Sequence, residues 1–229
     1  MLAERRQTEE LMDDPALDAG TYLAVLGDLA KVNGFTFAYR PTLAFLERAL
    51  GNRTHFRLLD VGFGDGDMLR RIATWAARRG LSADLVGVDL NTRSKAAAER
   101  APHPPGAPIS YLAGDYAEQA GGGFDCVISS LVAHHMSEPQ LRAFVRFMEA
   151  ESAAGWFIND LHRHTLSYLG WPVLARTMGW HPIVRADGHT SIARSYRPAE
   201  WRVLLDSEGL GAAQVQRWFP FRLCVERLR

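Results

Sequence analysis

One short run of the chain decides its fold class. It reads Leu58-Leu59-Asp60-Val61-Gly62-Phe63-Gly64-Asp65-Gly66. An apolar strand pattern leads into this run, three glycines interrupt it, and the residues that follow have the composition and spacing of a helix. Glycine lets the backbone approach a ligand closely, and the amide groups at a helix start favour electron-rich ligand atoms. The run therefore predicts a ligand-binding loop between a strand and a helix.

The spacing of the glycines separates two classes of ligand. A dinucleotide fingerprint needs a glycine three residues after the second one, but Asp67 stands there and the third glycine is Gly66. A nicotinamide-dependent oxidoreductase is therefore the weaker alternative.

Outward from this run, short apolar runs alternate with longer amphipathic stretches, which is the pattern of an α/β sheet. The predicted strands are 56–61, 84–88, 109–113, 124–130, 155–159, 212–218 and 221–227, and the predicted helices are 66–79, 92–100, 138–150, 165–178 and 198–208. The first five strands alternate with helices and should be parallel, whereas only Phe219 and Pro220 separate the last two, which should be antiparallel. A helical lead-in precedes the first strand.

Length, charge and cysteine content exclude several classes of protein. The chain has 229 residues, enough for one large domain, and its 26 Lys and Arg balance its 26 Asp and Glu, so no net charge attracts nucleic acid. No apolar stretch approaches the roughly 18 to 20 residues that span a bilayer, and no apolar signal core opens the chain. Cys126 and Cys224 each stand in an apolar run, as reduced cysteines do. We expect a cytoplasmic protein without stable membrane insertion.

The pattern Asp60-x-Gly62-x-Gly64-x-Gly66 resembles motif I of the class I S-adenosylmethionine-dependent methyltransferases. The resemblance covers residues 56–227, because the seven predicted strands also end in an antiparallel pair, as in that family. It implies an α/β fold with a seven-stranded Rossmann-like sheet, an antiparallel last strand and an N-terminal helical lid. It also implies one methyltransferase domain over 1–229, with a lead-in or lid at 1–52, a catalytic core at 56–229 and a lid insertion at 165–196. S-adenosylmethionine is the implied cofactor.

The same resemblance assigns further cofactor residues. Asp89, at the end of the second strand, would accept both ribose hydroxyls. Asp115 would accept from the exocyclic amine of adenine, with Tyr116 or Leu90 packed on the ring, and Ser130 completes the implied set. Each residue also has a plain structural explanation, since a glycine turn permits tight packing and Asp89 or Asp115 can cap a helix or turn. Their joint occurrence in this order favours cofactor binding.

The candidate catalytic residues follow the fourth strand. Methyl transfer from a sulfonium needs mainly a close, aligned and dry nucleophile, so a base is optional. His134 and His135 lie where the carboxyl end of the fourth strand should face the substrate. The run from His134 to Glu138 resembles the His-x-aromatic-Ser-acid run of small-molecule O-methyltransferases, in which the histidine is the base, although Met136 replaces the aromatic residue. The alternative is that both histidines only fix a loop over the cofactor.

The candidate substrate residues come from three segments. Asn159 and His162 end the fifth strand, Tyr39 and Arg40 belong to the lead-in, and Arg194 belongs to the insertion. The arginines could bind a substrate carboxylate or, equally, pair with surface acids. The aromatic residues of the lead-in and insertion could form an apolar lid or pack in the core.

A metal site is the alternative for the four histidines near this sheet edge. Asn159 and Asp160 partly resemble the cation site of catechol-type methyltransferases. Those enzymes also place a carboxylate after the fourth strand, where this chain has Ser129 and Ser130, and magnesium prefers oxygen ligands. The sequence therefore predicts no metal, and a solvated histidine cluster instead.

The residues near 156–161 and 193–196 resemble a subgroup of bacterial methyltransferases associated with polyketide and quinone-like aromatic products. This resemblance implies a small, largely apolar acceptor, methylated on the hydroxyl of a phenolic or polyketide-derived compound. C-methylation of a quinol-like ring and a non-catalytic S-adenosylmethionine-binding or partner-binding module stay open, as does a homodimer. The chain lacks the Asn/Asp-Pro-Pro-aromatic turn of nucleobase amino-methyltransferases, and Cys126 should be buried in mid-strand rather than act as a nucleophile.

Overall fold

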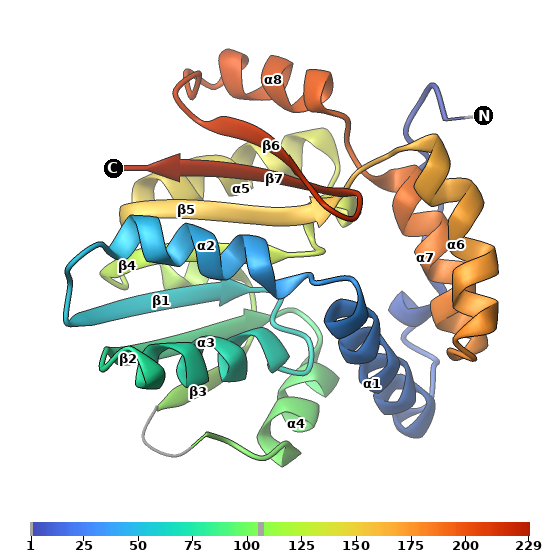
Figure 1. Ribbon diagram of the computed structural model, residues 1–229, viewed down its shortest axis with the longest axis horizontal. Coiled ribbons are helices and arrows are strands. Elements are labelled where there is room, and N and C mark those ends of the chain that lie inside the picture. Colours follow the sequence, from blue (N-terminus) through green and yellow to red (C-terminus); the bar gives the residue numbers. More distant parts are fainter. Residues whose placement is uncertain (1, 105–107) are drawn as a thin grey trace.

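The computed structural model describes residues 2–104 and 108–229, and its centre is a seven-stranded sheet (Figure 1). The strand order is β3-β2-β1-β4-β5-β7-β6. The strands are β1 (His55–Val61), β2 (Ser82–Asp89), β3 (Ile109–Ala113), β4 (Phe124–Ser130), β5 (Ser152–Leu161), β6 (Gln214–Trp218) and β7 (Arg222–Leu228). The first five are parallel, and β7 is antiparallel to both neighbours, as the sequence predicts.

The register brings the carboxyl ends of the parallel strands to one edge. Val61 pairs with both Val88 and Ser129, and Ser130 pairs with Asn159. The chain crosses over between β1 and β4, so the strand order reverses there. Ligands of open α/β sheets bind outside the strand ends at such a point.

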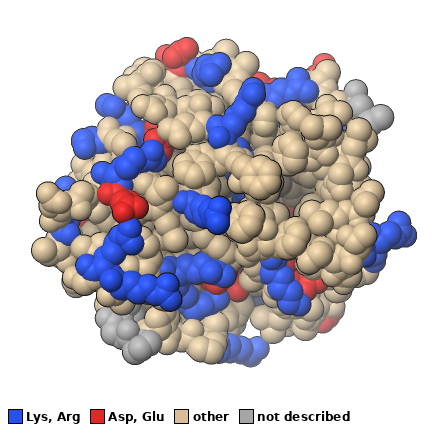
Figure 2. Space-filling model, in the orientation of Figure 1, with Lys and Arg blue, Asp and Glu red and all other residues tan. Residues whose placement is uncertain are grey.

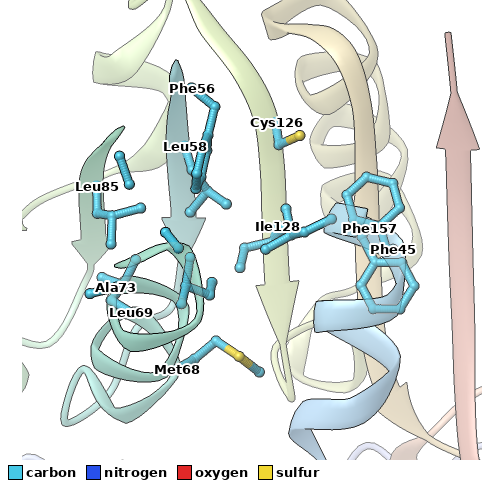
Figure 3. Packing of buried hydrophobic residues seen from close by; sticks show 14 of the residues in the cluster. Phe45, Phe56, Leu58, Met68, Leu69, Ala73, Leu85, Cys126, Ile128 and Phe157 are labelled. Atoms are coloured by element: carbon cyan, nitrogen blue, oxygen red, sulfur yellow. The ribbon is translucent and has the colours of Figure 1, made fainter. Parts of the chain in front are cut away.

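Eight α-helices surround the sheet in the described part of the chain. They are α1 (Ala19–Phe35), α2 (Tyr39–Leu50), α3 (Asp67–Arg78), α4 (Thr92–Arg100), α5 (Glu138–Glu151), α6 (Thr165–Thr177), α7 (Pro182–Arg194) and α8 (Pro198–Ser207). Two apolar clusters show how helices cover the sheet: α2 and α3 pack on one face, and α5 and α8 pack on the other. Figure 3 shows the first cluster, where Phe45 of α2 stacks on Phe157 of β5 with ring centroids 5.0 Å apart.

Three helices lie beyond the carboxyl ends of the strands instead of on a sheet face. They are α1, α6 and α7, which stand beside one another at the right of Figure 1. The sequence predicts a single helix at 165–178 in this region and misses α7. The turn at Gly179, with its φ of 66°, ends α6, and Pro182 then begins α7 at a position where proline is favoured. The predicted helical lead-in is present as α1 and α2.

Two observations concern membrane-spanning helices and basic side chains in the described part of the chain. None of the helices in the described ranges is both long and apolar enough to cross a membrane. Basic side chains are scattered among uncharged ones on the face in Figure 2. Cys126 and Cys224 are both buried as free thiols, and burial raises the pKa of each to about 12, so neither is a ready nucleophile.

Candidate active site

A cavity of about 600 Å³ lies at the carboxyl edge of the parallel strands. The loops after β1, β2, β3 and β4 supply one half of its lining, and residues 10–39, β5, α6, α7 and the start of β7 supply the other. The two halves differ in chemistry. The first is rich in carboxylates, glycines and backbone groups, whereas the second is mostly apolar but also contains the acids Glu10, Asp13 and Asp187.

The glycine loop forms the floor of the first half because only glycine fits there. Gly62 has a φ of 78°, and a Cβ atom on it would lie 2.3 Å from Cγ2 of Val132. Gly66 is the residue before α3, at a φ of 74°, and its added Cβ would lie 2.6 Å from the Tyr111 ring. The left-handed backbone and these close approaches both exclude larger side chains. The loop is thus shaped by packing, and its backbone also lines the cavity.

Asp89 and Leu90 follow β2 on the same side of the cavity. The carboxylate of Asp89 accepts from the backbone N–H groups of Gly64, at 3.0 Å, and Asn91, at 2.8 Å, which fixes its orientation. Each carboxylate oxygen keeps a further lone pair that could accept a ribose hydroxyl. Leu90 lines the cavity with 76% of its surface exposed, so its side chain is open to a flat ring.

Asp60 is buried and Ser130 is half-buried, and each has a buried side-chain oxygen without a partner in the described structure. Asp60 Oδ1 and Ser130 Oγ make no hydrogen bond, and both residues line the cavity. Burial, with a contribution from the nearby charge of Asp89, raises the pKa of Asp60 to about 7. Buried polar groups are normally hydrogen-bonded, so these two could serve a polar ligand.

Asp115 and Tyr116 stand at the start of the 3-10 helix η2 (Tyr116–Gln119), and both line the cavity. Asp115 is exposed and accepts from the N–H of Ala117 at 2.9 Å. Its capping role is therefore real, and its remaining lone pairs face solvent. The Tyr116 ring packs edge-on against Phe144 and Phe147, which fixes it at the rim.

His134 is held between two buried carboxylates. Its Nδ1 lies 2.7 Å from Asp160 Oδ1, and its Nε2 lies 3.3 Å from Glu10 Oε1. Burial by itself lowers the pKa of His134, but Asp160 and Glu10 outweigh it and raise the pKa to about 9. Both ring nitrogens are therefore occupied, and the ring does not offer a free lone pair to a substrate hydroxyl.

His135 lies beside His134, with ring centroids 4.3 Å apart. Its Nδ1 lies 3.1 Å from Asp13 Oδ2 and its Nε2 lies 3.7 Å from Glu10 Oε2. Glu10 and Asp13 belong to the N-terminal segment, residues 2–18, which thus reaches across to the loop after β4. A solvated histidine cluster is the wrong prediction, because His134 and His162 are buried and the N-terminal segment covers the first of them.

The second half of the cavity contains a buried cation. Arg222 begins β7, is only 3% exposed and lines the cavity. One guanidinium nitrogen donates to Asn33 Oδ1 at 3.0 Å, the other terminal nitrogen has no partner, and no carboxylate of the described residues forms an ion pair with it. The apolar residues that line this half of the cavity are Val25, Leu29, Val32, Leu161, Trp171, Val184 and Ile192.

The structure brings two of the five predicted substrate residues to the cavity. Tyr39 donates its hydroxyl to Asp67, and Asn159 donates its amide to the carbonyl of Ala38 at 2.7 Å and to Thr42 Oγ1 at 3.2 Å. Both side chains are thus engaged within the protein.

The other three lie outside the cavity lining. Arg40 is exposed, with its guanidinium 4.3 Å from the centre of the Phe37 ring. Arg194 is buried behind His135 and donates to its carbonyl at 3.3 Å, and His162 packs against His164 with ring centroids 5.3 Å apart. These three residues are close in sequence to elements that line the cavity, but their side chains do not line it.

Sequence reasoning missed Glu10, Asp13 and Arg222. Each is remote in sequence from the groups it faces, and none belongs to a local motif. Glu10 lies within the lead-in beside a second acid, Glu9, and nothing in the local sequence distinguishes the two.

A cavity over a glycine loop, at the point where the strand order reverses, is also found in known proteins of this fold. Residues 58–150 match a family model described as a methyltransferase domain. The segment 58–150 is therefore similar to a methyltransferase domain. This match includes the glycine loop, Asp89, Asp115 and both histidines of the loop after β4. No curated protein matches the chain.

Solved structures share the fold at low sequence identity. The plantazolicin methyltransferase BpumL with S-adenosylhomocysteine (SAH) is 16% identical, covers 89% of this chain and 74% of its own, and has a TM-score of 0.64. The magnesium protoporphyrin IX methyltransferase of Synechocystis PCC 6803 with SAH is 19% identical over 95% of this chain and 90% of its own, at 0.57. A SAM-dependent methyltransferase from Aquifex aeolicus is 14% identical, the match covers 92% of this chain and 97% of that chain, and the TM-score is 0.61. The predicted S-adenosylmethionine-dependent methyltransferase is confirmed at the level of domain and fold.

Proposed function

We propose that the protein transfers a methyl group from S-adenosylmethionine to the hydroxyl of a small, largely apolar phenolic or polyketide-derived acceptor. The observation that carries the proposal is the division of one cavity into a half suited to a nucleoside and a mostly apolar half that Arg222 also lines. A cofactor and an acceptor placed in the two halves would meet near the switch point of the sheet.

The cofactor half supplies one group for each part of S-adenosylmethionine. Asp89 suits the ribose hydroxyls, Leu90 and Tyr116 suit the faces of adenine, and Asp115 suits its exocyclic amine. Asp60, a buried carboxylate without a partner, suits the α-ammonium group of the methionine portion. A positive ligand next to Asp60 would restore its ionised form, because an opposite charge favours ionisation.

The acceptor half explains how a hydroxyl can be methylated without His134 as a base. Both ring nitrogens of His134 face carboxylates, so neither is free for the acceptor. The guanidinium of Arg222 would instead favour binding of the acceptor as its phenolate, whose proton has passed to water before the cavity closes, or would hold a carboxylate elsewhere on it. The apolar walls would exclude water and align the oxygen with the methyl group, which is most of what this displacement requires.

C-methylation of a quinol-like ring is the second candidate. A ring whose oxygen is bound as an anion by Arg222 is also electron-rich at its neighbouring carbons, so the same arrangement favours both reactions. The atom that carries the new methyl group in the product, identified by NMR with a ¹³C-labelled cofactor, separates them.

Titration of the full-length protein with SAH and with NAD tests the cofactor half. We expect SAH to bind and NAD to give no heat, whereas NAD binding without SAH binding would overturn the proposal. Turnover of phenolic acceptors with labelled S-adenosylmethionine then tests the reaction. SAH binding without transfer to any hydroxyl or ring carbon would favour the non-catalytic module.

Three coarser aspects of the same proposal concern the whole chain. We propose that residues 1–229 act as one domain, with 1–52 and 165–196 closing over the cavity as a lid. The buried free thiols of Cys126 and Cys224 support a reducing, cytoplasmic location. A balanced charge of 26 basic and 26 acidic residues supports a small molecule over nucleic acid as the acceptor, and a homodimer stays a prediction.

A further inference from the structure

Two histidines and a carboxylate meet at one corner of the cavity. We propose that His134, His135 and Glu10 form a binding site for one divalent transition-metal ion of the zinc type. Their ligand atoms all lie within 4.8 Å of one another, and all three residues line the cavity. This site goes beyond the methyl transfer proposed above and does not depend on it.

The distances between the ligand atoms suit such an ion. His134 Nε2 lies 3.3 Å from Glu10 Oε1, and His135 Nε2 lies 3.7 Å from Glu10 Oε2. Two ligands bound at about 2.0 to 2.2 Å in a tetrahedral arrangement are about 3.3 to 3.6 Å apart. The His134–Glu10 distance already lies in this range, and the His135–Glu10 distance, to the other carboxylate oxygen, exceeds it by about 0.1 Å.

The outer contacts of the two rings are those that metal-binding histidines make. Asp160 Oδ1 lies 2.7 Å from His134 Nδ1, and Asp13 Oδ2 lies 3.1 Å from His135 Nδ1. A histidine that binds a metal usually donates its other N–H to a carboxylate, which fixes the ring and strengthens the ligand. Here both rings have this second partner, and in each case Nε2 is left facing Glu10.

The local charge also calls for a cation. Glu10, Asp13 and Asp160 bring three negative charges to the two rings, and the one guanidinium within ion-pair distance of Glu10 in the described structure is that of Arg194, at 3.8 Å. In the metal-free protein a proton on His134 balances part of this charge. A bound ion would displace that proton, and the neutral imidazoles would then leave two negative charges, which a divalent ion balances. Imidazole and carboxylate ligands suit zinc or cobalt, whereas magnesium prefers a shell of oxygens.

An ion here would have two consequences for the cavity. It would tie the N-terminal segment, through Glu10, to the loop after β4. Three protein ligands also leave one tetrahedral position, which a water or an acceptor oxygen could occupy. The site differs from the magnesium site considered from the sequence, because its carboxylate comes from the N-terminal segment and not from the loop after β4.

Cobalt titration of the chelator-stripped, full-length protein tests the site directly. We expect one equivalent of Co²⁺ to bind with the visible absorption bands of four-coordinate cobalt, and Zn²⁺ to displace it. His135→Ala and Glu10→Gln should each lower the affinity for cobalt by about 100-fold or more, and Asp13→Asn by about 10-fold, as losses of an outer carboxylate do. His164→Ala is the matched control, since that ring also packs against a histidine but forms no ion pair with an acid of the described residues.

Melting temperature and far-UV circular dichroism, measured without metal, show whether each variant is folded. A folded His135→Ala or Asp13→Asn protein that binds cobalt as tightly as the wild type would overturn the site, as would a wild-type protein that gives no absorption or binds magnesium alone. If Glu10→Gln fails to fold, the cobalt affinities of His135→Ala and Asp13→Asn still decide whether the site exists.

Discussion

The two halves of the cavity are built in different ways. The cofactor half comes from loops that directly follow β1, β2, β3 and β4, so each of its groups stands at a fixed place after a strand. The acceptor half joins α1, β5, α6, α7 and the first residue of β7, which are remote from one another in sequence. Local sequence motifs therefore predict the first half, whereas the second half is assembled only when remote segments meet in the folded chain.

The glycine loop offers the largest test of the cofactor half. In Gly62→Ala the new Cβ would meet Val132 at 2.3 Å in a left-handed backbone, which together should cost about 3 to 4 kcal/mol and lower SAH affinity about 100- to 1000-fold. Gly80→Ala is the control, because Gly80 has a φ of 69° but nothing within 4 Å of an added Cβ. Calorimetric titration with SAH measures both, and equal affinities in the two variants would contradict a ligand-shaped loop.

How much the sequence reveals follows from the same contrast. The loop at 58–66 and the strand-end Asp89 could be predicted because strand, turn and helix signals lie within a few residues of each other. Arg222 could not, because the chain reversal before β7 alone places it against the end of β5, where it pairs with Leu161. Helix α7 also escapes prediction, because its middle residues Asp187, Gly188 and Thr190 leave no apolar stripe at helical spacing.

The buried carboxylate of Asp60 should lower the free energy of unfolding of the protein without its cofactor. Its folded pKa of about 7 lies above the ordinary value of 3.8, so the empty protein is favoured with Asp60 protonated and loses stability as pH rises from about 4 to 7. Asp60→Asn removes that loss, and we expect it to be more stable than the wild type by about 2 to 3 kcal/mol at pH 8 and by little at pH 4.

Urea unfolding without cofactor, at both pH values, measures the difference. The same variant should bind SAH more weakly, because an amide cannot pair with the α-ammonium group as a charge. A variant that gains no stability at pH 8 would mean that another group compensates the buried carboxylate.

Arg222 carries the corresponding test of the acceptor half. Arg222→Met should raise the KM for a phenolic acceptor about 10- to 100-fold, since a hydrogen bond to a charged group contributes about 1.5 to 3 kcal/mol, and should leave SAH affinity unchanged. Arg217→Met, at an exposed arginine of the neighbouring strand, should change neither. Steady-state kinetics with titration of SAH separates the two halves, and a fall in SAH affinity would place Arg222 against the cofactor instead.

The smallest effect should come from Leu90, and it tests whether an exposed apolar side chain serves the ligand alone. With 76% of its surface exposed, Leu90 contributes little to the core, so Leu90→Ala should leave the melting temperature within about a degree or two. If Leu90 packs on adenine, the same change should lower SAH affinity about fivefold, or roughly 1 kcal/mol of lost apolar contact. Val203→Ala, at a residue 68% exposed on α8, should change neither quantity. Equal SAH affinities in Leu90→Ala and the wild type would move the adenine away from the end of β2 and toward Tyr116, because the rim offers a second ring-packing surface there.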